Sequence, residues 1–336
     1  MRPPEFWKAD VSGRDAARTL RALLTPISWA YAWAASQRHR RTVTRHTPVP
    51  VVCIGNLTLG GAGKTPIARA VRAMLGPDAH TLSRGYGGRL PGPLRVTGDM
   101  RAEEVGDEPL LHAADGPAWI ARDRLAGALA ASQAGAHAIV MDDGFQNPTL
   151  AKDVSIIVVD PGFGIGNGEV FPAGPLRERL RDGLTRAHAV VILYNTWTTG
   201  VSQARTPAVQ DWLADFAKPV LTARLVPVVE VPSGKLLAFA GLARPEKFFD
   251  TLINLGADVA DYAPYPDHHL YNDDDLTLLT RLAEDHNATL ITTEKDAARL
   301  APQWRARVAV LPVVAKFDEP GAVDALLAPV RARMSR

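Results

Sequence analysis

From residue 50 onward, short apolar runs alternate with stretches that carry apolar residues every three or four positions. The first pattern is typical of buried strands and the second of amphipathic helices. Runs such as 138–141 contain no polar position, which indicates a parallel sheet covered by helices on both faces. We therefore predict an α/β fold, with strands at 50–55, 79–83, 117–121, 137–142, 154–159 and 188–194, and helices notably at 66–75 and 122–134.

A second alternating set follows residues 219–232, a Pro- and Val-rich stretch that we interpret as a connector. The segment 160–183 is rich in Gly, Pro and charge, which is typical of a functional loop. We predict an N-terminal segment at 1–45, a main lobe at 46–228 and a smaller α/β lobe at 229–336. The elements expected in the smaller lobe are strand 236–240, helix 245–255, strand 258–262, helix 273–285, strand 288–293, helix 294–300, strand 308–314 and helix 319–332.

The N-terminal segment has a composition of its own. Between two basic clusters lies an apolar and aromatic stretch from Leu20 to Ala35, with Pro26 as a break or a helix start. This stretch is shorter than the roughly 20 apolar residues that a spanning helix needs. A helix lying in a membrane interface would use such aromatic and basic residues to bind anionic headgroups. A helix docked on the protein's own core explains the pattern equally well.

Charge is distributed unevenly along the chain. The net charge is +2, yet residues 1–45 hold nine Lys and Arg against three Asp and Glu, so they carry +6 and the remainder −4. A mildly acidic body disfavours nucleic-acid binding. The single cysteine, Cys53, lies in an apolar strand and excludes an internal disulfide, which fits a reducing, cytosolic compartment. The N-terminus lacks the pattern of a secretory signal.

The strongest chemical signal is Gly60-Gly61-Ala62-Gly63-Lys64-Thr65, which follows the first strand, with Pro66 in the first turn of the next helix. Glycine-rich backbone and a helix N-terminus bind polyphosphates, with Lys64 on the outer phosphates and the Thr65 hydroxyl on Mg²⁺. The start is irregular: the common pattern has Gly at Thr58, and a related ATPase group has Lys at Leu59. An ordinary glycine turn is the alternative. Because no Asn-Lys-x-Asp element for guanine is present, we predict ATP as the nucleotide.

Two carboxylates, Asp142 and Asp143, stand at the end of the strand predicted at 137–142. Downstream of a phosphate loop, an Asp at a strand end is the usual second anchor for Mg²⁺. The carboxyl ends of strands also form the edge at which α/β sheets bind ligands. We predict Thr65, Asp142 and Asp143 as metal ligands, the alternative being a turn with solvated acids.

Four further motifs lie in predicted loops or at element ends. The glycine-rich stretch 83–89 carries Arg84 and suits an anionic ligand, or is a plain surface loop. Asp107, in Gly-Asp-Glu-Pro, either caps the next helix or acts as a general base. The Asp-His-His run at 267–269 lacks the further ligands of a zinc set, and is either solvated or meets the phosphate site when the lobes close. The run 293–296 resembles a helix cap first and a ligand contact second.

In this order, the motifs resemble one family, the tetraacyldisaccharide 4′-kinases, or lipid A 4′-kinases, of Gram-negative bacteria. The resemblance spans most of residues 50–300, and Asn147 departs from it because His is expected there. The segments that carry the resemblance are Gly55–Thr58 with Gly60–Thr65, SRGYGG at 83–88, GDEP at 106–109, DDGFQ at 142–146, PAGPLRE at 172–178, FAGLARPEKFF at 239–249, PDHH at 266–269 and TEKD at 293–296.

The resemblance implies a P-loop kinase lobe and a smaller C-terminal lobe with the active site between them. The implied reaction moves the γ-phosphate of ATP, with Mg²⁺, to the 4′-hydroxyl of a tetraacylated glucosamine disaccharide 1-phosphate, giving the 1,4′-bisphosphate lipid IVA. Asp107, kept basic and oriented by His268, would accept the hydroxyl proton, with Lys64 and Asp143 as further catalytic residues. The candidate substrate contacts are Arg84, Glu108, Arg177 and Glu178.

The resemblance also implies a peripheral protein on the cytoplasmic face of the bacterial inner membrane, which favours membrane contact by residues 1–45. Its expected partner is the lipid disaccharide, with no nucleic acid and no obligate protein partner. Two rival hypotheses remain at this point. One is a P-loop NTPase that works as a conformational switch or a metallochaperone-like ATPase. The other is a non-catalytic nucleotide-binding membrane adaptor, which gives the GDEP and PDHH motifs no task.

Overall fold

The computed structural model describes residues 4–8, 15–195 and 206–335. Two sheets organise them, one of nine strands in the order β13-β8-β7-β6-β1-β5-β2-β4-β3 and one of four. The large sheet is parallel except at its edges, where β3 and β13 run antiparallel to their neighbours. Its strands are β1 (Val51–Gly55), β2 (Ala79–Ser83), β3 (Leu94–Val96), β4 (Ala118–Ile120), β5 (Ala138–Asp142), β6 (Val154–Val159), β7 (Ala189–Asn195), β8 (Val220–Pro227) and β13 (Val313–Phe317).

Helices cover both faces of the large sheet, and side chains from both faces of its central strand, β1, are buried. In β1, Val51 and Cys53 belong to the core on one face, and Val52 and Ile54 to the core on the other. The predicted α/β class, with a mostly parallel sheet, is confirmed. The helices of this part of the chain are α2 (Lys64–Leu75), α3 (Ala102–Val105), α4 (Asp107–Asp115), α5 (Arg124–Gln133), α6 (Leu180–Arg186), α8 (Thr206–Leu213) and α13 (Pro320–Met334).

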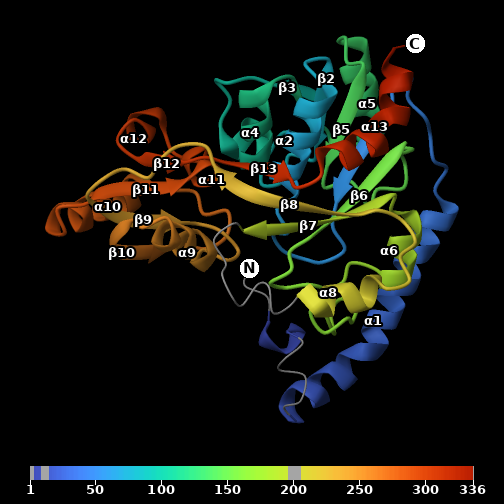
Figure 1. Ribbon diagram of the computed structural model, residues 1–336, viewed down its shortest axis with the longest axis horizontal. Coiled ribbons are helices and arrows are strands. Elements are labelled where there is room, and N and C mark those ends of the chain that lie inside the picture. Colours follow the sequence, from blue (N-terminus) through green and yellow to red (C-terminus); the bar gives the residue numbers. More distant parts are fainter. Residues whose placement is uncertain (1–3, 9–14, 196–205, 336) are drawn as a thin grey trace.

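The smaller lobe is a four-stranded parallel sheet in the order β10-β9-β11-β12, set to one side of the large sheet (Figure 1). Leu276 and Leu279 pack on one face of it, and Phe248 and Leu252 on the other. Its elements are β9 (Lys235–Ala240), α9 (Glu246–Asn254), β10 (Asp258–Pro264), α10 (Asp273–Asp285), β11 (Thr289–Thr293), α11 (Glu294–Ala297), α12 (Pro302–Arg305) and β12 (Ala309–Leu311).

The C-terminal part of the chain returns to the large sheet, which corrects the prediction. The expected strand 308–314 is two strands, and the second of them, β13, pairs antiparallel with β8. The predicted connector 219–232 therefore contains β8, a strand of the large sheet. Residues 313–335 lie with the main lobe, because α13 buries Val323 and Leu327 in the same core as Ile67 of α2.

The N-terminal residues form η1 (Glu5–Trp7) and one long helix, α1 (Asp15–Arg41), and α1 runs along the lower right side of the molecule in Figure 1, away from the small sheet. Pro26 lies inside this helix, so the predicted break or start there is wrong. Ser28 is buried against the body, where its hydroxyl accepts a hydrogen bond from the Ala173 N–H at 3.0 Å. Across the described ranges, none of the helices combines the length and the apolar character that crossing a bilayer takes.

The packing of α13 gives a testable prediction about stability. Replacing the fully buried Leu327 with Ala should lower the free energy of unfolding by about 2–5 kcal/mol, because it leaves a cavity in the main core. Urea unfolding monitored by circular dichroism measures the change. Leu278→Ala, at a side chain that is 54% exposed, is the matched control and should cost far less. Equal losses in the two variants would contradict the placement of α13.

Candidate functional site

The predicted phosphate loop connects β1 to α2 at the carboxyl edge of the large sheet. Gly60 and Gly63 have φ angles of 107° and 76°, which favour glycine. Side chains and backbone from elsewhere fix the irregular start of the loop: the Leu59 N–H donates to the Pro175 carbonyl at 2.8 Å, and Arg177 Nε donates to the Thr58 carbonyl at 3.1 Å. The loop is therefore held by the 172–178 segment, the PAGPLRE motif.

Lys64 and Thr65 are the first two residues of α2, and Pro66 is the third. The first N–H groups of this 12-residue helix have no partner within the helix, and they point toward the loop, where an anion would bind. The Lys64 ammonium lies 3.6 Å from a carboxylate oxygen of Asp143 and 3.4 Å from Asn56 Oδ1. The residues predicted to bind nucleotide thus form one strand–loop–helix unit.

Asp142 lies beside this unit because β5 pairs with β1 in parallel, with Asp142 opposite Ile54. The Thr65 hydroxyl donates to Asp142 Oδ2 at 2.9 Å, and His112 Nε2 lies 2.9 Å from the same oxygen. The carboxylate is 1% exposed, and among the described residues its other oxygen, Oδ1, has no hydrogen-bond partner. Leaving a buried carboxylate oxygen unpaired is costly, and such an oxygen is the hard ligand that Mg²⁺ prefers. Thr65 and Asp142 therefore fit the predicted metal.

Asp143 faces a different set of partners. Its φ angle of 51° is uncommon for a residue with a side chain, and it turns the carboxylate toward Arg177 Nη1 at 3.0 Å and Lys64. Burial opposes ionisation of this carboxyl, but the charges of Lys64 and Arg177 lower its pKa. Asp143 is therefore an anion that holds two cations beside the phosphate loop.

The other predicted substrate contacts are spread out. Glu178 is buried, and its carboxylate accepts hydrogen bonds from Gln146 at 3.1 Å and Arg186 at 2.6 Å. Glu108 pairs with Lys295 of the smaller lobe at 3.0 Å. Arg84 is exposed. Within the same glycine-rich stretch it is Tyr86 that meets the other lobe, with its ring 5.3 Å from the ring of His268.

Asp107 is the meeting point of the two lobes. Gly106 is the N-cap of α4 and Asp107 its first helical residue, so the capping alternative for Asp107 is wrong. Its Oδ2 lies 3.0 Å from His268 Nδ1 and accepts from Arg299 Nε at 2.8 Å, while Oδ1 accepts from the Glu108 N–H. The carboxylate is 3% exposed and the Arg299 side chain 1%. The neighbouring His269 instead lies 2.8 Å from Asp275 within the smaller lobe.

These contacts set the acidity of Asp107. Burial alone would raise its pKa, but the hydrogen bond with His268 and the charges of Lys295 and Arg299 outweigh it, so the pKa lies well below its ordinary value. Asp107 is therefore ionised but a weak base, and its role as the proton acceptor stays a prediction. It is held as an anion and oriented by two residues of the other lobe.

The short helix α11 supplies much of the contact between the lobes. Thr293 is its N-cap and accepts a hydrogen bond from the Asp296 N–H at 3.1 Å, as the predicted capping arrangement requires. Glu294 pairs with Arg69 of α2 at 3.1 Å, and Lys295 pairs with Glu108. Arg299, just beyond the helix, reaches Asp107.

Two residues of this site escaped the sequence analysis. His112 occurs once in the mostly apolar helix α4 and gives no motif, although it touches the carboxylate of Asp142. Arg299 stands three residues after Asp296, in a stretch that the sequence predicts as an ordinary helix, so nothing in the pattern assigns this arginine to a site. Both gain a role only from residues that are distant in sequence.

Comparison with known proteins points in one direction. A family model described as tetraacyldisaccharide-1-P 4′-kinase matches residues 20–331. A tetraacyldisaccharide 4′-kinase of Rhodospirillum centenum is 50% identical over 98% of this chain and 97% of its own, and one of Hyphomonas neptunium is 46% identical over 100% of both. The crystal structure of an "apo" form of LpxK from Aquifex aeolicus in complex with ATP matches with a TM-score of 0.73 at 27% identity, covering 93% of this chain and 99% of that one.

The lowered pKa of Asp107 predicts how acid affects stability. Because this pKa is lower in the folded chain, ionised Asp107 stabilises the fold above the ordinary value of 3.8, and the effect is lost as the pH falls below it. Asp107→Asn should lower the free energy of unfolding by about 1.5–3 kcal/mol near pH 7, since the buried Arg299 loses one of its two carboxylate partners and keeps only Asp296. The difference in unfolding free energy between the wild type and Asp107→Asn, the stability gap, should narrow by up to about 1.4 kcal/mol for each pH unit below 3.8.

Urea unfolding of both proteins between about pH 7 and pH 3 measures this gap. Asp78→Asn, at a side chain that is 64% exposed, is the control and should show almost no gap at any pH. A gap for Asp107→Asn that stays constant on acidification would show that the charge of Asp107 is not what stabilises the contact.

Proposed function

This chain belongs to the tetraacyldisaccharide-1-P 4′-kinase family, and we propose that it transfers the γ-phosphate of ATP to the 4′-hydroxyl of a tetraacylated glucosamine disaccharide 1-phosphate. The product is the 1,4′-bisphosphate, lipid IVA. The observation that carries this proposal is the place of Asp107 and His112 on one helix. His112 contacts Asp142 and through it Thr65. Five residues of rise along α4 amount to about 7.5 Å, so one short helix links Asp107 to the carboxylate beside the nucleotide site.

ATP binds at Gly60–Pro66 in this proposal. The loop amides and Lys64 hold the phosphates, and the N-terminus of α2 adds its favourable field. Use of ATP agrees with the ATP complex of the related LpxK. Asp143, itself held by Arg177, keeps Lys64 in place, which matters because phosphoryl transfer depends on positioning and charge neutralisation more than on covalent help.

Mg²⁺ would be held by Thr65 and Asp142, where the unpaired Oδ1 offers a ligand. Bound there, it would neutralise charge on the transferred phosphate. His112 is a positioning residue in this arrangement, because its hydrogen bond fixes the other oxygen of Asp142. Asp143, the other predicted metal ligand, is committed to Lys64 and Arg177 and serves to orient them.

The acceptor hydroxyl meets the Asp107–His268 pair. His268 is 28% exposed and Asp107 only 3%, so the imidazole is the part of the pair that solvent and substrate can reach. Asp107 holds Nδ1 of this ring and fixes its orientation, and the pair takes the hydroxyl proton as a unit. A weakly basic carboxylate suffices, because a loose phosphoryl-transfer transition state asks little of the base.

The acceptor is a lipid, and α1 offers a surface for its membrane. Leu23, Ile27, Trp29 and Trp33 are between 56% and 70% exposed on this helix, and basic residues follow in its last turn. Such a surface binds an anionic bilayer through apolar burial and charge. The enzyme therefore works as a peripheral protein at the cytoplasmic face of the inner membrane.

The rival functions differ from this one in a single measurement. A nucleotide switch or a metallochaperone-like ATPase releases ADP without a lipid acceptor, and an adaptor does not release ADP at all. We expect ADP release that depends on the dephosphorylated disaccharide lipid and yields a new phosphomonoester on it. Acceptor-independent release at the same rate would overturn the proposal.

Removing the carboxylate of Asp107 tests the acceptor site. Asp107→Ala should lower turnover by about 10²- to 10⁴-fold, because the proton acceptor loses its orienting charge, while ATP affinity stays within a few-fold. Steady-state kinetics and calorimetric titration with ATP give the two quantities. Asp78→Ala, at a side chain that is 64% exposed, is the control and should leave turnover nearly unchanged. Unchanged turnover in Asp107→Ala would remove this residue from the mechanism.

Exposed apolar residues of α1 give a test of membrane binding. Leu23→Gln combined with Ile27→Gln should weaken partition onto vesicles of phosphatidylethanolamine and phosphatidylglycerol by about 100-fold, because two large apolar side chains no longer bury. Sedimentation with the vesicles measures this. The matched control, Ile253→Gln with Leu278→Gln, changes side chains that are 51% and 54% exposed in the smaller lobe. An equal loss in both double variants would contradict the role of α1.

A further inference from the structure

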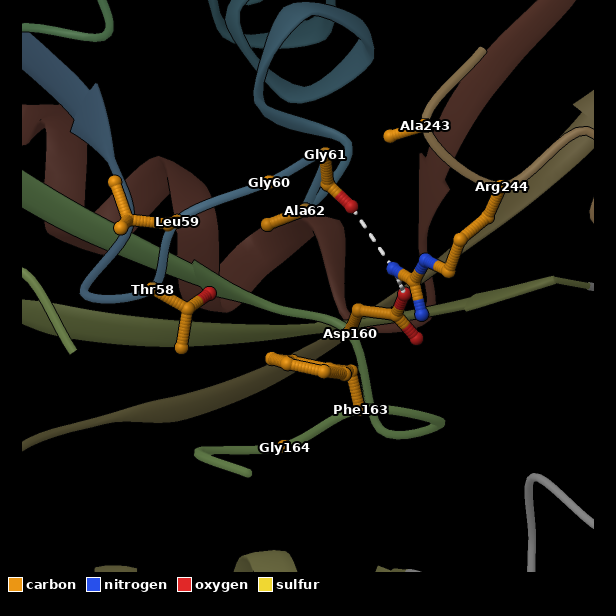
Figure 2. A pocket seen from close by; sticks show the side chains of 10 residues that line it. All are labelled: Thr58, Leu59, Gly60, Gly61, Ala62, Asp160, Phe163, Gly164, Ala243 and Arg244. Atoms are coloured by element: carbon orange, nitrogen blue, oxygen red, sulfur yellow. Dashed lines mark hydrogen bonds and ion pairs between the residues drawn. The ribbon is translucent and has the colours of Figure 1, made fainter. Parts of the chain in front are cut away.

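A small pocket opens directly against the phosphate loop, and both lobes line it (Figure 2). One wall is the loop itself, from Thr58 to Ala62, and a second wall is the start of the 160–183 loop after β6. The smaller lobe contributes Ala243 and Arg244, from the loop between β9 and α9. The functions assigned above to the smaller lobe, through His268, Lys295 and Arg299, leave this second approach to the nucleotide site unexplained.

Arg244 is the charged side chain that the smaller lobe extends into this pocket (Figure 2). Its Nη2 donates to the Gly61 carbonyl at 2.9 Å and also pairs with Asp160. The guanidinium carbon lies 5.6 Å from the centre of the Phe163 ring, and the side chain is 20% exposed. A carboxylate, an aromatic face and a backbone carbonyl thus fix an arginine of one lobe against the phosphate loop of the other.

The charges around Arg244 leave room for an anion. Asp160 carries one negative charge and pairs with two cations, Arg244 and Lys247. Burial opposes ionisation of Asp160, but the charges of Lys247 and Arg244 lower its pKa, so it is an anion. Lys64 adds a further positive charge on the same loop. The mouth of the loop is therefore positively charged before any phosphate arrives, although Asp143 and Asp160 each reduce the excess.

The bond from Arg244 to Gly61 is the one that a phosphate can replace. A peptide carbonyl is a neutral acceptor, and a hydrogen bond from a guanidinium to an ionised phosphate oxygen is about twice as strong. Arginine also has five N–H donors in a planar fork, so it can keep its pair with Asp160 while it binds a phosphate. Gly61 belongs to the loop that would hold the phosphates, so only a short shift of the side chain is needed.

We propose that Arg244 is a phosphate-contacting residue supplied by the smaller lobe, which exchanges the Gly61 carbonyl for an outer phosphate oxygen of ATP and stays anchored by Asp160 and Phe163. This inference rests on the proposed nucleotide site at Gly60–Thr65. In phosphoryl transfer, an arginine brought in from outside the phosphate loop stabilises the charge on the transferred group. Arg244 would then couple closure of the smaller lobe to the presence of the γ-phosphate.

The competing interpretation is that Arg244 only ties the lobes together. A tie of this kind contributes equally whether the bound nucleotide is ATP or ADP. A phosphate contact distinguishes the two, because ADP lacks the γ-phosphate. The ratio of the two affinities therefore separates the interpretations, and a purely structural role would not change it.

The experiment compares Arg244→Ala and Arg244→Lys with the wild-type chain in calorimetric titrations with Mg-ATP and Mg-ADP, followed by acceptor assays. Arg244→Ala should weaken ATP binding about 10-fold, since a charge-assisted hydrogen bond is lost, and leave ADP binding within about twofold. Turnover should fall about 100-fold or more, and added guanidinium should restore part of it. Arg244→Lys keeps the positive charge but loses the planar set of N–H donors, so its turnover should lie between those of the wild type and Arg244→Ala.

Arg224→Ala is the matched control, because Arg224 pairs with Asp318 on the surface and should affect neither affinity nor turnover. Equal weakening of ATP and ADP by Arg244→Ala, or turnover within about threefold of wild type, would overturn the inference. Lys64→Ala separates this failure from failure of the nucleotide site. If Lys64→Ala binds ATP like the wild type, the proposed site is wrong and the inference falls with it. If Lys64→Ala loses ATP and Arg244→Ala keeps the wild-type ratio, only the inference is wrong.

Discussion

The buried ion pair between Asp107 and Arg299 is the interaction on which the two-lobed site depends. Both side chains are almost completely shielded from solvent, and they come from different lobes. Within the smaller lobe Arg299 also pairs with Asp296, so it is Asp107 that relies on the other lobe for its partners, and removing the partner of a buried charge costs several kcal/mol. The same contact holds His268 over Asp107, because both donors meet one carboxylate oxygen. Lobe packing and the arrangement of the acceptor site are therefore one property of this chain.

The sequence predicts local units well and long-range pairings poorly. The β1–loop–α2 unit is predictable because strand, glycines and helix are neighbours in the chain, and the structure has them in that order. The return of β13 and α13 to the large sheet could not be predicted, since an apolar strand does not show which sheet edge it will pair with. The lowered pKa of Asp107 could not be predicted from the sequence for a similar reason. It depends on Lys295 and Arg299, which are nearly two hundred positions away in the chain.

The sequence pattern of the long helix α1 does not show which of its sides packs on the body. Its apolar residues point in several directions, so a helix docked on the body and a helix in a membrane interface share one sequence signature. The structure separates the two sets: Ser28 and Ala32 face the body, while Leu23, Ile27 and Trp33 remain exposed. Docking on the body is therefore seen on one side of the helix, and contact of the exposed side with a bilayer stays a proposal.

A common electrostatic arrangement recurs around the site. Lys64 pairs with Asp143, Arg244 with Asp160 and Arg299 with Asp107, so each cation is held by a carboxylate before the nucleotide binds. Unpaired, these cations would repel one another across a partly dry cleft. The pairs in reach of the phosphate loop are partly exposed, whereas the Arg299 pair is sealed. Cations that are to meet phosphate can therefore exchange partners at low cost, and the one that only orients Asp107 cannot. All three side chains carry the same charge, so it is solvent access that distinguishes Lys64 and Arg244, which are proposed to bind phosphate, from Arg299, which orients Asp107.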